Sequence, residues 1–129
     1  TELAKYVKVD PNPINGLKGP HVVFHHANVH VQSGSGTTFE ARGVTGLGNL
    51  IVGYNEGTGS RTGSHNLVVG PSHTYTSTSG VVFGESNTVV ARSAVSLGGL
   101  QNRNEGPRSS ILGAFQQTIL PVYQEYTIP

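Results

Sequence analysis

The sequence contains no cysteine, methionine or tryptophan, and only 12% of its 129 residues are charged. The absence of cysteine excludes disulfides and thiolate chemistry. Eight basic and seven acidic residues give a net charge of +1, and the basic residues are dispersed along the chain. This distribution offers no electrostatic footprint for nucleic acid. No stretch reaches the roughly 18 apolar residues of a membrane span, so we expect no membrane insertion by this chain.

Glycine, valine, threonine, serine and asparagine dominate the sequence, with 18 glycines in all. These residue types favour strands and turns over long helices. A chain rich in glycine and serine is also compatible with disorder, but the regular spacing of its apolar residues argues against that state. The composition therefore predicts an all-β fold.

A short apolar phrase that ends in glycine recurs along the second half of the chain. It reads NLIVG, NLVVG, GVVFG, AVSLG and SILG, and its glycines are residues 53, 70, 84, 98 and 113. A second register follows each glycine with a similar step, at His73, Asn87, Asn102 and Gln117. Matched positions at a fixed period are typical of a solenoid, in which each coil stacks on the one before it. Separate hairpins would need neither feature.

We therefore predict a parallel β-solenoid, a β-roll or β-helix with coils of 14–17 residues. Residues 1–48 form an N-terminal capping segment with short strands, residues 49–120 form the coils, and residues 121–129 form a C-terminal cap or tail. Glycine takes the corners because it accepts positive φ without a steric penalty. The longer first step predicts a bulged loop at residues 56–62. Residues 28–31 (NVHV) read as an earlier, divergent copy of the first strand.

The column of asparagines predicts a structural role for their side chains. Asn66, Asn87 and Asn102 either form ladders of side-chain amides between coils or take left-handed turn conformations.

The repeats over residues 49–119 resemble the head repeats of trimeric autotransporter adhesins, which contain an Asn/Ser-x-Val-x-Ile-Gly core. Related repeats occur in phage tail fibres and other bacterial surface proteins. The resemblance implies a left-handed parallel β-roll that exists only as a trimer. It also implies an extracellular, cell-surface or virion-surface location, and a host matrix protein or a glycan as ligand.

The apolar triplets predict a homo-oligomer, a trimer. Alternate residues of a strand face opposite sides. If the first and third residues of each triplet point into the coil, the middle residues form an apolar stripe outside it, and such stripes mark interfaces. The predicted interface residues are Ile51, Val68, Val82 and Ile111. In the alternative, residues 1–48 fold over this stripe within one chain.

The function expected from these features is structural and adhesive: a rigid spike, fibre or adhesin-head segment. Tyr54, His73 and Tyr75 are the candidate ligand contacts. One alternative is a self-assembling appendage or tail-fibre subunit without a ligand. Another is a trimeric solenoid enzyme with an interfacial histidine metal site. Ice binding is a further solenoid activity, but Arg103 interrupts the threonine array of Thr74, Thr88 and Thr118.

We expect no enzyme activity, no catalytic residue, no cofactor and no metal. Solenoid acyltransferases and carbonic anhydrases are built from hexapeptides, and the 14-residue and 15-residue steps here do not accommodate three faces. No nucleophile elbow, zinc-binding HExxH motif or phosphate-binding loop is present. His21, His25, His26 and His30 cluster in sequence, yet no acidic partner stands at a recognisable spacing.

Overall fold

The computed structural model describes residues 1–121, and the chain divides into two units between His30 and Val31. The first unit holds a short 3-10 helix η1 (Leu3–Lys5) and an antiparallel hairpin of β1 (Val7–Asp10) and β2 (His21–Phe24). The predicted capping segment is therefore split, because only residues 31–48 belong to the unit that holds the coils. The predicted cap or tail at 121–129 lies outside the described residues except for Pro121.

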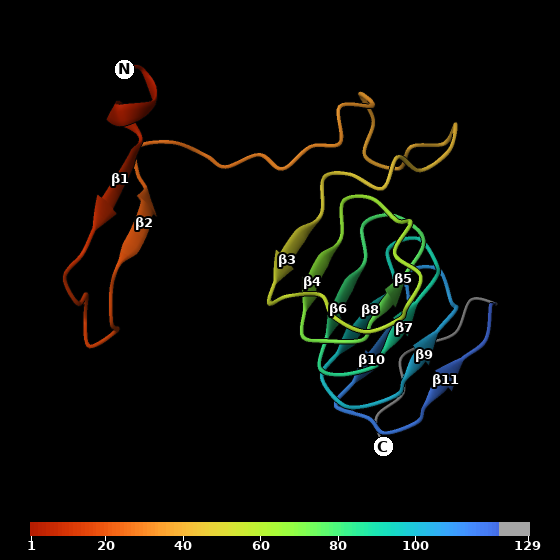
Figure 1. The fold of residues 1–129 in the computed structure, drawn as a ribbon. Helices are drawn as coiled ribbons and strands as arrows, with labels where there is room; N and C mark the ends of the chain where they lie inside the picture. The colour runs from red at the N-terminus through yellow and green to blue at the C-terminus, as the bar shows by residue number, and fades with distance from the viewer. Residues whose placement is uncertain (122–129) are drawn as a thin grey trace. The chain divides into compact units, whose positions relative to one another are not determined.

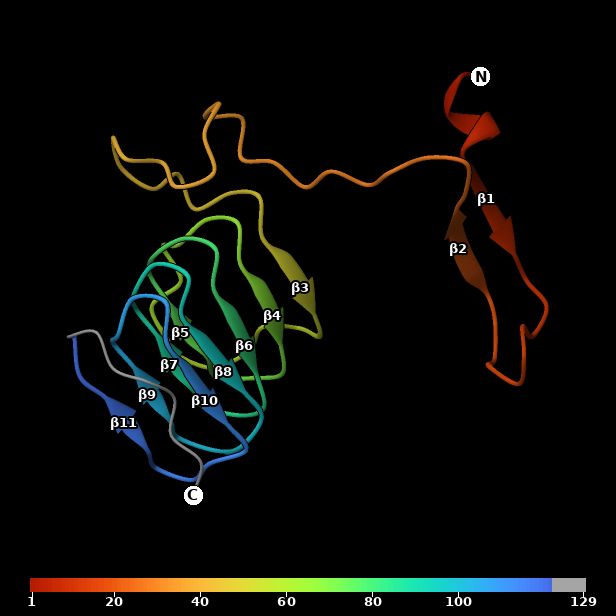
Figure 2. The same ribbon diagram turned by 180° about the vertical axis from the view of Figure 1, so that it is seen from behind.

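The second unit is a parallel β-solenoid of about five turns, as the repeats predicted. One sheet contains, in spatial order, β3 (Leu50–Val52), β4 (Leu67–Val69), β6 (Val81–Phe83), β8 (Val95–Leu97) and β10 (Ser110–Leu112). The other contains β5 (Thr74–Tyr75), β7 (Thr88–Val89), β9 (Arg103–Asn104) and β11 (Thr118–Ile119). Figures 1 and 2 show the two sheets as opposite walls of one narrow coil.

Each triplet pairs with the equivalent triplet of the next coil, so that Leu50 lies beside Leu67 and Leu67 beside Val81. The glycine after each triplet has positive φ, which confirms its predicted place at the corner. Space as well as conformation requires glycine here. A Cβ on Gly70 would lie 2.0 Å from the carbonyl oxygen of Gly84 in the next coil. Neighbouring coils thus touch backbone to backbone at this corner.

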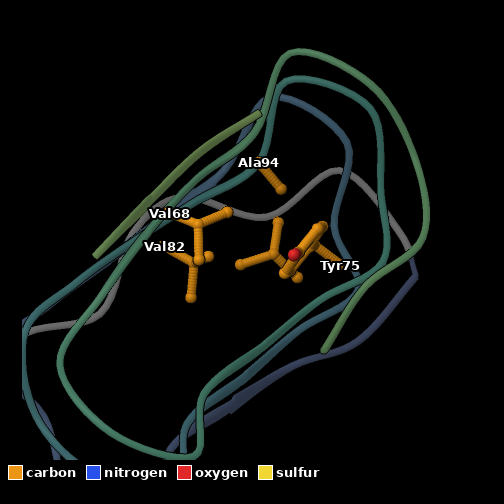
Figure 3. Packing of buried hydrophobic residues seen from close by; sticks show 5 residues of the cluster. Val68, Tyr75, Val82 and Ala94 are labelled. Atoms are coloured by element: carbon orange, nitrogen blue, oxygen red, sulfur yellow. The ribbon is translucent and has the colours of Figure 1, made fainter. Parts of the chain in front are cut away.

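The middle residue of each triplet points into the coil, which is the opposite of the predicted orientation. Val68, Val82 and Ile111 are at most 1% exposed. Figure 3 shows Val68 and Val82 directed toward Tyr75 from the other sheet. The triplets are apolar on both faces, so alternation alone could not decide which face is inside. The narrow coil accommodates one side chain from each triplet, and the two residues that flank it face outward.

The predicted asparagine ladders are present at two corners of the coil. At one corner the backbone N–H of Asn102 donates to Oδ1 of Asn87 at 2.8 Å, and the N–H of Gln117 donates to Oδ1 of Asn102 at 2.9 Å. At the other, the N–H of Asn66 donates to Oδ1 of Asn49 at 2.9 Å. Each side chain therefore bonds the backbone of the following coil.

We expect Asn87→Ala to destabilise the solenoid strongly. Asn87 is fully buried, its Nδ2 donates to the Phe83 carbonyl at 2.8 Å, and its Oδ1 accepts from Asn102. Truncation leaves the buried Asn102 N–H without a partner, at a cost of about 1–3 kcal/mol, and removes one of the two bonds to the Phe83 carbonyl, which keeps the bond from the Gly98 N–H. Urea unfolding should show a loss of roughly 2–4 kcal/mol. The control is Thr88→Ala. Thr88 follows Asn87 directly and its side chain faces outward, so this change should cost less than about 1 kcal/mol. Equal midpoints for both variants would contradict the ladder's role.

Candidate functional site

The outer face of the β3–β10 sheet is a regular apolar feature of the solenoid. The first and third residues of the five triplets form two straight columns on it, because the strands pair in register. These outer columns contain Leu50, Leu67, Val81, Val95 and Ser110 in one row and Val52, Val69, Phe83, Leu97 and Leu112 in the other. Ser110 is the one polar member, and no charged residue stands in either column.

The outer columns are accessible. Leu50 and Val52 are about half exposed, at 52% and 53%, and Leu97 and Leu112 are 37% and 41% exposed. The column members on β4 and β6, which lie in the middle of the sheet, are half-buried. Strands that are apolar on both faces are normally covered on both faces. This sheet is covered on the inside by the coil core, and the outside carries an apolar surface in which Ser110 is the one polar column member.

The predicted interface residues do not lie on this surface. Val68, Val82 and Ile111 are interior, and Ile51 occupies the same column at the open first coil, where it is only partly buried. An apolar stripe is still present on the outside of the coil, but it is made by the flanking residues of each triplet, which are apolar too. The oligomeric state itself stays a prediction.

Two of the three predicted ligand contacts are buried, so the prediction is wrong for them. His73 is fully buried and takes the place of asparagine in the ladder: its Nε2–H donates to the Val69 carbonyl at 3.0 Å, and its Nδ1 accepts from the Asn87 N–H at 3.1 Å. Tyr75 is 3% exposed and lies in the core, with its hydroxyl donating to Asn55 Oδ1 at 3.2 Å. Tyr54 remains a candidate, since it is 96% exposed at the corner after Gly53.

The bulged loop predicted at 56–62 is present and replaces the second strand of the first coil. The Arg61 guanidinium holds it, donating to the backbone carbonyls of Glu56, Gly57 and His73 at 2.9–3.2 Å. Because all three acceptors are structural, this arginine is used to shape the loop.

Residues 33–48 fold onto the first coil around one buried carboxylate. Glu40 is 5% exposed and accepts from the Ser33 hydroxyl at 2.6 Å and from the Thr45 N–H at 2.9 Å. The Ser33 hydroxyl first, and then that of Ser64 and the Thr45 N–H, hold the pKa of the Glu40 carboxyl well below its usual range. Ser64 belongs to the first coil and also accepts from the Gly46 N–H. Glu40 therefore joins the loop to the solenoid.

His65 makes the second attachment. Its Nδ1–H donates to the Thr38 carbonyl at 2.9 Å, and its Nε2 accepts from the Ser33 N–H at 3.0 Å. A shallow cavity of about 260 Å³ lies between His65 and residues 32–38. Both ring nitrogens are already bonded, and the other lining side chains are serine, threonine and glutamine. This cavity therefore has no group ready to act as a general acid or base.

The outward side of the second sheet is polar. Thr74, Thr88, Arg103 and Thr118 are aligned across its strands. Arg103 forms an ion pair with Glu105 in the middle of this row. A charged pair at that place interrupts the flat threonine array on which ice binding depends.

The histidines near the N-terminus do not form a site with other metal ligands. Within residues 1–121, no three histidine, aspartate or glutamate side chains come close enough to hold a metal ion. His26 has positive φ and lies after β2, and His30 is also outside any strand, so these two histidines share no strand face. In the same part of the chain, no helix has the length and hydropathy needed to cross a membrane.

Comparisons with protein families, with curated proteins and with solved structures find no match.

We expect the attachment of the loop to weaken in acid. The pKa of Glu40 is lower in the folded chain than its ordinary value of 4.5, so its contribution to stability is complete above that pH and is lost as the pH falls below it. Hydrogen exchange at the Thr45 amide should therefore be slow at neutral pH and accelerate in acid beyond its intrinsic trend. Glu40→Gln should remove this pH dependence and leave the amides of β6 unchanged. Unchanged protection of Thr45 in this variant would contradict the assignment.

Proposed function

We propose that this chain is a non-enzymatic structural module, a rigid β-solenoid segment of a bacterial or virion surface fibre or adhesin head that functions as a homo-oligomer. The observation that carries the proposal is the apolar outer face of the β3–β10 sheet. Rigidity is consistent with the coil-to-coil ladders, which run over the first three coils at one corner and from the second coil to the fifth at the other. The location follows from the resemblance of the repeats to adhesin heads.

A second copy of the same chain is the occupant that best fits the outer face. The outer columns carry no charge, so no electrostatic complement of another chemical class is indicated. Nine of their ten side chains are apolar, from β3 to β10, so the columns of one copy offer an apolar surface to those of another. Burial would yield roughly 25 cal/mol per Å² of apolar surface. We infer a trimer, as the resemblance implies.

The outer face is too small to hold a stable oligomer together without another contact. Five strands spaced by about 4.8 Å, with three residues of about 3.3 Å each, give a footprint of roughly 240 Å². Side-chain relief raises the accessible area above this value, but a standard interface buries about 800 Å² per partner. A stable oligomer of this chain therefore needs a further contact.

The adhesive part of the proposal rests on Tyr54. A tyrosine that is 96% exposed offers an aromatic face and a hydroxyl to a ligand such as a glycan or a matrix protein. Tyr54→Ala should then lower the binding of such a ligand and leave the oligomer intact.

The oligomer is tested by placing a carboxylate on each side of one strand. Val81→Asp puts the charge on the outer face, and we expect a folded chain of lower native mass by sedimentation. Val82→Asp buries an unpaired charge in the coil, and we expect it to unfold, since such burial costs several kcal/mol. Thr88→Asp, on the polar side of β7, should change neither mass nor fold.

A wild-type chain that sediments as a folded monomer at micromolar concentration would overturn the proposed oligomer. So would a Val81→Asp chain that keeps the wild-type mass. Far-ultraviolet circular dichroism of each variant separates loss of assembly from loss of fold.

A further inference from the structure

Within residues 1–121, no strand pairs with the edge of β3 that faces away from β4. In later coils the glycine after each triplet donates its N–H to the preceding coil: Gly70 to the Val52 carbonyl at 3.3 Å, and Gly84 to the Val69 carbonyl at 3.2 Å. The N–H of Gly53, the equivalent residue of the first coil, has no acceptor among residues 1–121. Open edges of this kind are templates for a further strand.

The asparagine ladder is open at the same end. The N–H of Asn66 donates to Asn49 Oδ1, and that of Gly80 donates to Asn66 Oδ1. The N–H of Asn49 itself has no acceptor within the described part of the chain. A residue with a side-chain oxygen, placed one coil earlier, would complete the ladder.

Residues 28–32 have the pattern that this edge requires. Their sequence NVHVQ matches NLIVG of residues 49–53, with asparagine first and apolar residues at the second and fourth positions. The segment pairs with no strand of the described chain and is drawn as an extended trace in Figure 1. Val29 and Val31 are 60% and 43% exposed.

We propose that residues 28–32 of one copy add as a parallel strand to the free edge of β3 in a neighbouring copy. In the register of the later coils, Val29 lies beside Leu50 and Val31 beside Val52. Both outer columns then extend by one residue, and the interface gains the area that the outer face lacks. The Asn28 side-chain oxygen then accepts a hydrogen bond from the Asn49 N–H. The Val31 carbonyl accepts one from the Gly53 N–H. This inference rests on the proposed homo-oligomer and names its second contact.

The anchor of Ser33 indicates that the strand comes from another copy. The Ser33 N–H donates to His65 Nε2, and a Cβ on Gly48 would lie 2.8 Å from the Ser33 nitrogen, so Ser33 sits beside the start of β3. The parallel register needs residues 32 and 33 at the opposite end of β3, beside Gly53. That end is about 16 Å from Gly48, at 3.3 Å per residue. The chain's own segment meets this requirement only by releasing His65. If each copy adds its strand to the next copy in the same direction around a ring, the assembly closes.

Disulfide trapping tests the contact, and the absence of native cysteine makes the readout clean. Val29→Cys and Leu50→Cys chains are mixed, oxidised mildly and separated without reductant. Paired parallel strands place these Cα atoms about 5 Å apart, within disulfide range. The matched control mixes Val29→Cys with Val52→Cys, which the register separates by about 8 Å. We expect several-fold more mixed dimer from the first mixture.

A backbone test uses proline in the same exposed segment. In the proposed register the Val31 N–H donates to the Ile51 carbonyl, while the His30 N–H points away from β3. Val31→Pro should therefore reduce the trapped dimer several-fold, and His30→Pro should leave most of it. Neither N–H has a partner within residues 1–121, so neither variant removes an existing bond.

The native mass of the unoxidised chain separates the two proposals. An oligomer that yields equal amounts of dimer from the matched and control mixtures overturns the strand exchange and keeps the proposed function. A monomer overturns both. A disulfide that forms within one chain of the Val29→Cys/Leu50→Cys double variant also overturns the exchange, since it places the strand on its own solenoid.

Discussion

The hydrogen bonds that join each coil to the next, in register, are the interaction on which the rest of this structure depends. They run through the backbone of two parallel sheets and through side-chain ladders at two corners. Because each bond links equivalent positions, a residue is constrained by the column it stands in more than by its neighbours in sequence. One extra residue is tolerated at the corner of the fourth coil, where Gly99 follows Gly98, and the fifth coil repeats it with Ala114. The insertion thus keeps the columns aligned.

The interior is too narrow to supply much apolar burial. Each coil contributes little more than one side chain from each sheet, and the fourth coil contributes Ser96 and Asn104, both fully buried. The apolar core is therefore divided into one cluster around Val82 and another around Ile111. Ser96 Oγ has no hydrogen-bond partner in the described structure, whereas Asn104 is bonded to backbone and side-chain groups. Directional bonds carry a large share of the stability, and much of the apolar surface stays outside.

The period, the glycine corners and the ladders could be predicted from the sequence because all three repeat. The side on which each triplet lies could not, since Leu67, Val68 and Val69 are all apolar and alternation gives no sign. The spacing places His73 in the column of Asn87 and Asn102, but the residue types of His73 and Tyr75 do not show which side of the coil their side chains face. His73 stands where later coils have Asn87 and Asn102, and Tyr75 stands where they have Val89 and Asn104. No repeat covers the loop at 33–48, so the buried Glu40 had no sequence signal.

The outer columns and the edge of β3 contribute differently to an assembly: the columns favour association, and the edge fixes the register between copies. Burial of the outer columns is non-directional, so it favours association and does not fix how far one copy slides along another. The backbone groups of Asn49 and Gly53 are directional and repeat once per coil, so a strand that pairs with them fixes position to one residue. A slip by one residue would remove Val29 and Val31 from the outer columns and place His30 in one of them. An assembly of this solenoid with a defined register therefore needs the edge as well as the face, and the edge is the part that selects the sequence of its partner.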